Sequence, residues 1–255
     1  MAQANATLAC DVGNSRIAVG CVMDEQADPV RRLDAEALGD LPEVLAELWA
    51  QMPDPKRVVA SSVCPDHLAA LQSAADGRLG QKVLIVGQDL PFPIDTDLPD
   101  PQRIGADRLC SAAMAYRRLQ SACVVADFGT AITIDCVSDD GVFLGGAILP
   151  GLTLSAEALA RGAAALPKVA LARPEGAFGK DTRQAILVGL VHGARGALRE
   201  FTEAYATELG QWPPLICTGG DAELVAGGYD IVHAIVPDLC LMGIALAGMQ
   251  ETLRP

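Results

Sequence analysis

The sequence predicts an α/β protein built from two similar halves. Short apolar segments typical of strands alternate along the chain with segments whose apolar residues follow helical spacing. A turn of the form Asp-x-Gly-polar ends a strand near the start of the chain and recurs about halfway along it. Hydrophobic residues make up 51% of the 255 residues and charged residues 20%, a composition that favours a packed core over disorder.

The first half opens with a predicted hairpin. The apolar run Thr7–Cys10 leads into Asp11-Val12-Gly13-Asn14-Ser15, and Arg16–Met23 then alternates like a second strand. The same reading gives helices over residues 38–51, 65–75 and 105–120, strands over 57–62 and 82–86, and a Pro- and Asp-rich loop over 87–104. This half is expected to span residues 1–120.

The second half, residues 121–255, repeats the pattern. Val124-Val125-Ala126-Asp127-Phe128-Gly129-Thr130 parallels the opening segment, and an alternating strand follows it. Further strands are expected over residues 131–137, 142–149, 215–218 and 229–233, and helices over 155–161, 181–208, 222–226 and 238–253.

The paired turns indicate phosphate chemistry. Gly13 and Gly129 let the backbone approach an anion closely, and Asn14, Ser15 and Thr130 add side-chain donors. Asp11 and Asp127 precede the turns, where a carboxylate can hold Mg²⁺ directly or through water. Either turn alone fits an ordinary tight turn capped by Asp, but the matched pair favours a clamp on nucleotide phosphates across a cleft.

Three further segments fall at predicted helix starts. Thr218-Gly219-Gly220 could let a nucleotide lie against the backbone, or could be a plain strand-to-helix turn. In Gly105-Ala106-Asp107-Arg108, Asp107 could be a catalytic carboxylate beside a cation, although the local sequence alone favours a helix N-cap. In Gly179-Lys180-Asp181-Thr182, a cap at Asp181 or Thr182 is the simple account.

Other patterns exclude several classes of protein. The net charge of −13 disfavours nucleic-acid binding, and the P-loop and dinucleotide glycine motifs are missing from the sequence. We expect the eight scattered cysteines, which include no C-x-x-C pair, to be small buried hydrophobic residues. The three histidines are expected to be structural or to lie on the surface. Without a signal peptide or a membrane-length apolar run, a cytoplasmic protein with reduced thiols is expected.

Taken together, these motifs resemble the type III pantothenate kinases, a family of the acetate and sugar kinase, chaperone ATPase and actin superfamily. The resemblance covers nearly the whole chain and depends on the joint order of its motifs. These are Asp11–Ser15, Ser61-Ser62-Val63-Cys64-Pro65, Gly105–Arg108, Asp127–Thr130, Gly145-Gly146-Ala147-Ile148-Leu149-Pro150-Gly151, Gly179–Thr182, Thr218–Gly220 and Pro237-Asp238-Leu239.

The resemblance implies two ribonuclease H-like halves of the actin-like ATPase fold, with mixed sheets flanked by helices and a cleft between them. It implies ATP-dependent phosphorylation of pantothenate to 4′-phosphopantothenate, the first step of coenzyme A biosynthesis, by a homodimer that uses Mg²⁺ and a monovalent cation, K⁺ or NH₄⁺. The implied ATP contacts are Asp11, Val12, Gly13, Asn14, Ser15, Arg16, Ile17, Ala18 and Thr130, beside Gly219 and Gly220 from the reading above. The implied substrate contacts are Gly105, Ala106, Asp107, Arg108 and Thr182, with Asp107 as proton acceptor and Asp127 as the monovalent-cation ligand.

The chain departs from this family at one expected substrate contact. Leu98 stands where relatives usually carry Tyr, and Asp100 replaces the usual Asn, so a contact with pantothenate is lost or altered. Two alternatives therefore stay open: a kinase of another small alcohol on the same fold, and a nucleotide-binding regulator without turnover.

Overall fold

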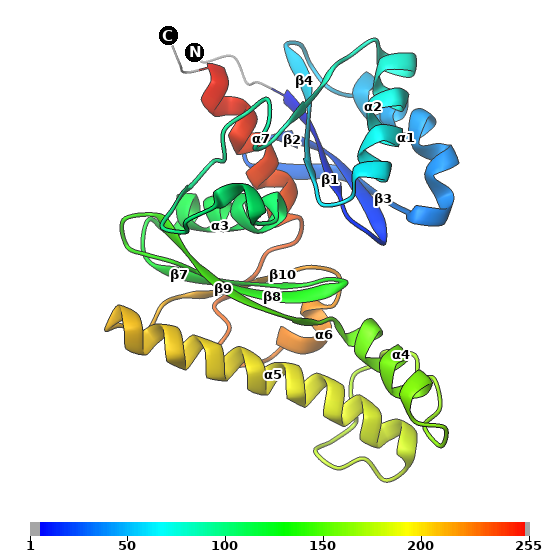
Figure 1. Cartoon of the computed structure of the whole chain (residues 1–255), viewed down its shortest axis with the longest axis vertical. Coiled ribbons are helices and arrows are strands. Elements are labelled where there is room, and N and C mark those ends of the chain that lie inside the picture. The colour runs from blue at the N-terminus through cyan, green and yellow to red at the C-terminus, as the bar shows by residue number, and fades with distance from the viewer. Residues whose placement is uncertain (1–5, 253–255) are drawn as a thin grey trace. The chain divides into compact units, whose positions relative to one another are not determined.

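The computed structural model describes residues 6–252, and their side chains up to Met249. The chain forms two compact units (Figure 1). The first takes its residues from Met1–Arg118 and Asp238–Pro255, and the second is Leu119–Pro237.

The first unit is built on a sheet with strand order β3-β2-β1-β4-β5. The central strand β1 pairs antiparallel with β2 and parallel with β4, so it is hydrogen-bonded along both edges. The strands are β1 (Ala6–Val12), β2 (Arg16–Met23), β3 (Gln26–Asp34), β4 (Lys56–Ser62) and β5 (Val83–Ile85).

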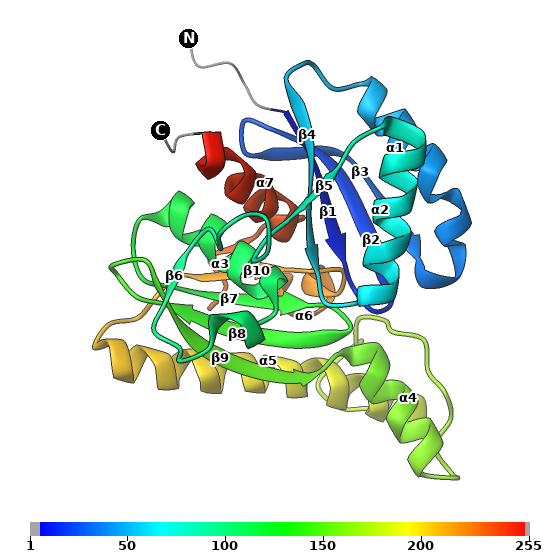
Figure 2. The same cartoon turned by 45° about the horizontal axis from the view of Figure 1, so that its top comes forward.

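Helices cover both faces of this sheet (Figures 1 and 2). Helices α1 (Leu41–Ala50) and α2 (Pro65–Leu79) enclose the apolar core on one face. Helix α7 (Leu239–Thr252) packs on β1 from the other face. A Cβ at Gly243 of α7 would overlap the backbone of Cys110 in α3 (Ala106–Leu119), so this glycine permits close contact between the two helices.

The second unit repeats the strand order of the first. Its strands run β11-β10-β7-β8-β9, with β7 antiparallel to β8 and parallel to β10, as β1 is to β2 and β4. Helices α5 and α6 pack on one apolar face of this sheet. The elements are β7 (Cys123–Phe128), β8 (Ala131–Val137), β9 (Val142–Pro150), α4 (Leu152–Gly162), α5 (Thr182–Leu209), β10 (Leu215–Thr218), α6 (Ala222–Ala226) and β11 (Ala234–Ile235).

The prediction of two similar α/β halves is confirmed, and three elements differ from expectation. Strand β3 was not predicted, because half of Gln26–Asp34 is polar and exposed on a sheet edge. Strand β11 lies after the expected segment 229–233. Helix α7 groups with the first unit, whereas the expected division placed residues 121–255 together.

Short elements complete the chain. A 3₁₀ turn precedes α1, and the Pro-rich loop before α3 contains a two-residue strand and a second 3₁₀ turn. These are η1 (Ala35–Asp40), β6 (Asp95–Thr96) and η2 (Pro101–Arg103). Within the described part of the chain, each helix is too short or too polar to span a bilayer.

The cysteines behave largely as predicted. All eight are free thiols, and all but Cys64 are buried. Burial raises the pKa of the Cys123 and Cys217 thiols to about 12 and that of the Cys136 thiol to about 11. These side chains are therefore protonated core residues at neutral pH.

Candidate functional site

The first Asp-x-Gly turn joins β1 to β2. Val12 pairs with Ile17 across the hairpin, and the Gly13 N–H donates to the Arg16 carbonyl at 3.0 Å. Asn14, Ser15 and Arg16 are exposed at its tip. The side chains of Val12 and Ile17 are buried in the core, so of these two predicted ATP contacts only the backbone is available.

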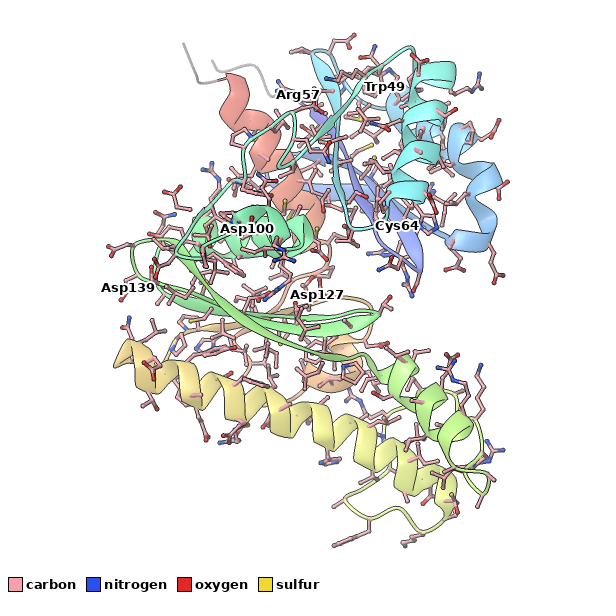
Figure 3. The ribbon with its side chains drawn as sticks, viewed as in Figure 1. Trp49, Arg57, Cys64, Asp100, Asp127 and Asp139 are labelled. Atoms are coloured by element: carbon pink, nitrogen blue, oxygen red, sulfur yellow. The ribbon has the colours of Figure 1, made fainter. Side chains whose placement is uncertain are left out.

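The connection from β4 to α2 supports this turn. The Val63 N–H donates to the Val12 carbonyl at 3.1 Å, and His67 Nδ1 lies 2.8 Å from the Gly13 carbonyl. The Ser62 hydroxyl accepts from the Cys64 N–H at 3.2 Å, which fixes the corner where α2 begins; Cys64 is labelled in Figure 3. The turn is thus held from outside its own hairpin.

Asp107 lies in the first turn of α3, which begins at Ala106. Its Oδ1 accepts from the Arg108 N–H at 2.9 Å, and a Cβ at Gly105 would overlap the same carboxylate. The expectation that Asp107 is the N-cap is therefore wrong, since it is inside the helix and folds back over Gly105. Burial raises the pKa of the Asp107 carboxyl, and the Arg108 backbone and side chain oppose that rise only partly.

Within the first unit, Asp107 lies near the end of β1. A Cβ at Gly105 would be 3.7 Å from Cγ1 of Val63, the residue bonded to Val12. Burial raises the pKa of the Cys110 thiol well above its usual range, and the nearby carboxylates of Asp107 and Asp11 raise it further. Both carboxylates are therefore close enough to Cys110 to act on the same buried thiol.

Leu98 lies in the loop between β6 and η2. It is half-buried, and its N–H donates to Thr96 Oγ1 at 3.2 Å in a local turn. The loop therefore has defined local structure where the sequence departs from its relatives.

The second turn, in the second unit, joins β7 to β8. Phe128 pairs with Ile132, and the Gly129 N–H donates to the Ala131 carbonyl at 3.0 Å, so this hairpin is one residue shorter than the first. Thr130 is exposed, and its carbonyl accepts from the Gly151 N–H at 3.0 Å. The turn is thus tied to the start of α4.

Asp127 and the predicted glycine turn lie side by side. Asp127 pairs in register with Thr218 of β10, and the Asp221 N–H donates to the Phe128 carbonyl at 3.0 Å. Gly219 has a φ of +95°, and a Cβ there would overlap the Asp127 carboxylate and approach Phe128 N to 2.6 Å. Only glycine fits this position, which places the Gly219-Gly220 backbone beside Asp127 (labelled in Figure 3).

Thr182 begins α5. Asp181 is the N-cap, as one of the two expected caps, and its side chain accepts from the Gln184 N–H at 2.8 Å. The Gln184 Oε1 accepts in return from the Lys180 N–H at 3.1 Å, completing a reciprocal cap. Thr182 is exposed at the first position of the helix, so its side chain is open to solvent.

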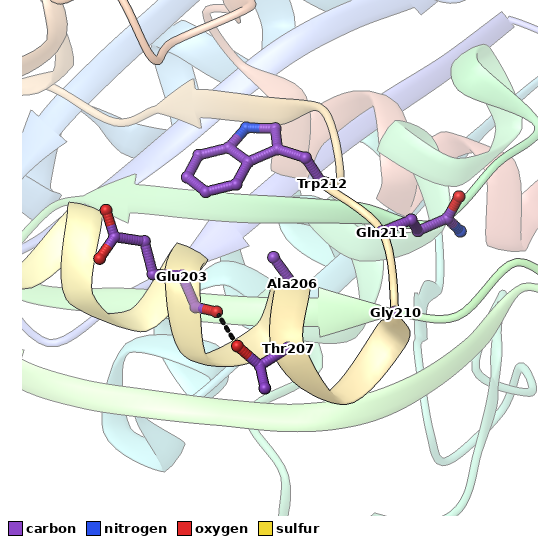
Figure 4. Close-up of a pocket in the computed structure, with 6 residues that line it drawn as sticks. All are labelled: Glu203, Ala206, Thr207, Gly210, Gln211 and Trp212. Atoms are coloured by element: carbon purple, nitrogen blue, oxygen red, sulfur yellow. Dashed lines mark hydrogen bonds between the residues drawn. The ribbon is translucent and has the colours of Figure 1, made fainter.

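A surface groove at the C-terminal end of α5 is a poor candidate for a phosphate site (Figure 4). Its lining residues are Glu203, Ala206, Thr207, Gly210, Gln211 and Trp212. The Thr207 hydroxyl already donates to the Glu203 carbonyl at 2.9 Å, and the only charged side chain among the lining residues is an acid. An anionic ligand would meet repulsion here.

Among the described residues, no three His, Cys, Asp or Glu side chains gather in a way that would hold a metal by themselves. A cation at either turn would thus take at most two such side chains, with backbone, phosphate or water oxygens completing its shell. Oxygen donors of this kind suit Mg²⁺ with bound nucleotide.

Comparison with known proteins agrees with the geometry. Residues 7–204 match the family model described as type III pantothenate kinase. Curated type III pantothenate kinases from Anaeromyxobacter sp. (strain K) and Dehalococcoides mccartyi are 35% and 31% identical over 246 residues. Each alignment covers 94% of this chain, and 97% and 95% of the respective relatives.

Solved structures show the same fold. A protein described as a Baf family transcriptional activator from Campylobacter jejuni superposes with a TM-score of 0.62 at 22% identity, covering 96% of this chain and all of its own. Component A of the (R)-2-hydroxyglutaryl-CoA dehydratase of Acidaminococcus fermentans gives a TM-score of 0.58 at 14% identity, covering 98% of this chain and all of its own. The two repeated sheets are those of the actin-like ATPase fold, and the chain belongs to the type III pantothenate kinase family, whose members phosphorylate pantothenate for coenzyme A biosynthesis.

Proposed function

We propose that this kinase transfers the γ-phosphoryl group of ATP to the hydroxyl of pantothenate with Asp107 as the proton acceptor. The observation that carries this assignment is the half-buried position of Asp107 in the first turn of α3, where desolvation raises the pKa of its carboxyl. A base works best when its pKa lies nearer the working pH, and it must take the hydroxyl proton as the new P–O bond forms. The Asp11 and Asp107 carboxylates both raise the pKa of the Cys110 thiol, which supports placing the base near the phosphate turn.

The ATP phosphates are assigned to backbone and short polar donors of both turns. Asn14, Ser15 and Arg16 are exposed at the first turn, and Thr130 at the second. The Gly219-Gly220 backbone beside Asp127 adds a surface without side chains. Backbone N–H groups in such turns bind anions without a P-loop.

The pantothenate contacts are assigned to the start of α3 and two further residues. Gly105 and Ala106 present backbone, Arg108 adds a cation, and Leu98 and Thr182 complete the set that the family resemblance implies. A leucine provides apolar surface without the hydroxyl of the family tyrosine. One lost hydrogen bond would weaken pantothenate binding by about two- to twelvefold.

Two cations fit the turns. Asp11 would hold Mg²⁺ together with the phosphates, and Asp127 would hold K⁺ or NH₄⁺. The proposal is supported by half-buried carboxylates beside exposed backbone, where a bound cation would offset the repulsion between carboxylate and phosphate. A bound cation would supply charge neutralisation, while the positioning of the phosphates stays with the protein donors.

A catalytic role is favoured over a nucleotide-binding regulator. A regulator needs no ionisable group inside α3, where burial makes the charged form of Asp107 costly. A cytoplasmic location is supported by eight free cysteines, which a reducing compartment would preserve. The net charge of −13 supports the absence of nucleic-acid binding.

We also propose a homodimer that uses a face of the second unit. Large apolar side chains are exposed on β9, on α4 and in the loop before α5, where Ile148 is 64% and Phe178 85% exposed. Leu144, Leu154 and Leu159 are also exposed on β9 and α4. Apolar surface gathered on neighbouring elements is typical of an interface.

Replacing Asp107 by Asn should lower kcat by about a hundredfold or more, because the amide keeps the shape and loses the basicity. Since burial raises the pKa of Asp107, wild-type kcat should also fall on acidification at a pH above the usual titration range of Asp. Steady-state ADP release with saturating pantothenate measures both effects.

The same substitution should leave thermal stability at pH 7 equal or higher. A carboxyl whose folded-state pKa is raised stabilises the fold only below its unfolded pKa, and that contribution is lost as pH rises through the folded pKa. Asp66→Asn, at an exposed acid in the first turn of α2, is the matched control. Near-normal turnover in Asp107→Asn, or a loss of turnover accompanied by unfolding, would contradict the assigned role.

Activity should be weak in Na⁺ buffer and strong in K⁺ or NH₄⁺, and Asp127→Ala should remove the difference between the salts. The reason is that a cation bound at the Asp127 carboxylate would offset the repulsion between this carboxylate and the ATP phosphates. Asp140→Ala, at an exposed acid of the same unit, should keep the full salt preference. Equal rates of ADP release in all three salts would exclude the monovalent-cation site.

Sedimentation at micromolar concentration should give a mass twice the 26.5 kDa of one chain. Ile148→Asp should shift the protein toward the monomer, because a charge would have to be buried at the interface. Trp212→Asp replaces another exposed apolar side chain outside β9 and α4 and should leave the mass unchanged. A monomeric wild type would refute the dimer.

A further inference from the structure

We propose that His67 is a positioning residue that sets the orientation of the Gly13–Asn14 peptide in the phosphate-binding turn. His67 lies in the first turn of α2, is half-buried, and its Nδ1 is 2.8 Å from the Gly13 carbonyl oxygen. A carbonyl only accepts hydrogen bonds, so Nδ1 must carry the proton in this contact. The inference rests on the proposed role of this turn in binding ATP.

The geometry of the peptide links this contact to the ligand side of the turn. In a trans peptide, the carbonyl of one residue and the N–H of the next point in opposite directions. A Gly13 carbonyl held toward α2 therefore directs the Asn14 N–H away from α2. Asn14 is exposed, and in the described chain its N–H has no hydrogen-bond partner, so this donor is available to an anion.

Without such a contact, the peptide could rotate easily. Gly13 has no Cβ, so the torsion on its side of the peptide meets little steric resistance. A rotated peptide would present the carbonyl oxygen to the phosphates in place of the N–H, converting an attraction into a repulsion. The hairpin itself does not prevent this, because its Gly13 N–H···Arg16 bond involves the preceding peptide.

The support around His67 is suited to this role. The preceding peptide is fixed by the Val63 N–H bond to the Val12 carbonyl at 3.1 Å, so β4 and α2 hold two successive carbonyls of the turn. Ser62 fixes the corner between them through its bond with the Cys64 N–H. The imidazole thus connects this supported segment to the Gly13–Asn14 peptide, which the Gly13–Arg16 hydrogen bond does not hold.

His67→Leu should raise the Kd of a non-hydrolysable ATP analogue with Mg²⁺ by about two- to twelvefold, the effect of one neutral hydrogen bond. The KM for pantothenate should stay within twofold of wild type. His67→Asn should restore the affinity, because its amide nitrogen can donate from nearly the position of Nδ1. Gln72→Leu, at an exposed site of the same helix, is the matched control.

Calorimetry measures the affinities. ¹⁵N NMR of the wild-type imidazole shows whether Nδ1 carries the proton, and this measurement does not depend on whether a variant folds. Unchanged ATP-analogue affinity in a folded His67→Leu, or a protonated Nε2 with bare Nδ1 in wild type, would overturn the inference. Failure of His67→Asn to restore affinity would point to packing and overturn it too. Failure of wild type itself to bind the analogue would instead overturn the proposed phosphate role of the turn, and the inference with it.

Discussion

The central strand of each unit is the constraint on which the remaining features depend. β1 is hydrogen-bonded on both edges, and its residues up to Cys10 are fully buried. A strand paired on both edges and covered on both faces cannot slip in register without breaking backbone hydrogen bonds on both edges and disturbing the packing on both faces. The sheet therefore fixes the positions of the residues at the end of β1, including Asp11 and the turn that follows it. β7 does the same for Asp127 in the second unit.

Around each turn, backbone contacts come from segments distant in sequence. In the first unit they come from Val63, between β4 and α2, and from the His67 side chain in the first turn of α2. In the second they come from α4 through Gly151 and from the β10–α6 turn through Asp221. A site made of backbone donors has few side chains to lose, so its accuracy depends on this support.

Asp107 stands where an ionised side chain costs free energy, as residues of functional sites often do. A charged carboxylate inside the first turn of a packed helix is less stable than in water, and the raised pKa expresses that cost. A neutral residue would suit the fold better, which makes a purely structural reason for the acid hard to sustain.

Much of the fold could be predicted because the repeated hairpins combine two local signals, alternation and a glycine turn. Strand β3 could not be predicted, since an exposed edge strand with four Arg or Asp side chains lacks an apolar pattern. The place of α7 could not either, because a helix that is apolar nearly all round does not indicate which sheet it covers. Asp107 looked like an N-cap because local sequence cannot fix a helix start to one residue. His67 seemed isolated, since its partner is a backbone carbonyl 54 positions away.

The central claim is that each of the two Asp-x-Gly turns binds nucleotide phosphates. Hydrogen exchange measured by mass spectrometry, with and without a non-hydrolysable ATP analogue and Mg²⁺, tests it directly. The account predicts slower exchange in the peptides that contain Gly13–Arg16 and Gly129–Ala131, and unchanged exchange around Gly210 at the end of α5. Protection of one turn alone, or of neither while the analogue is bound, would contradict it.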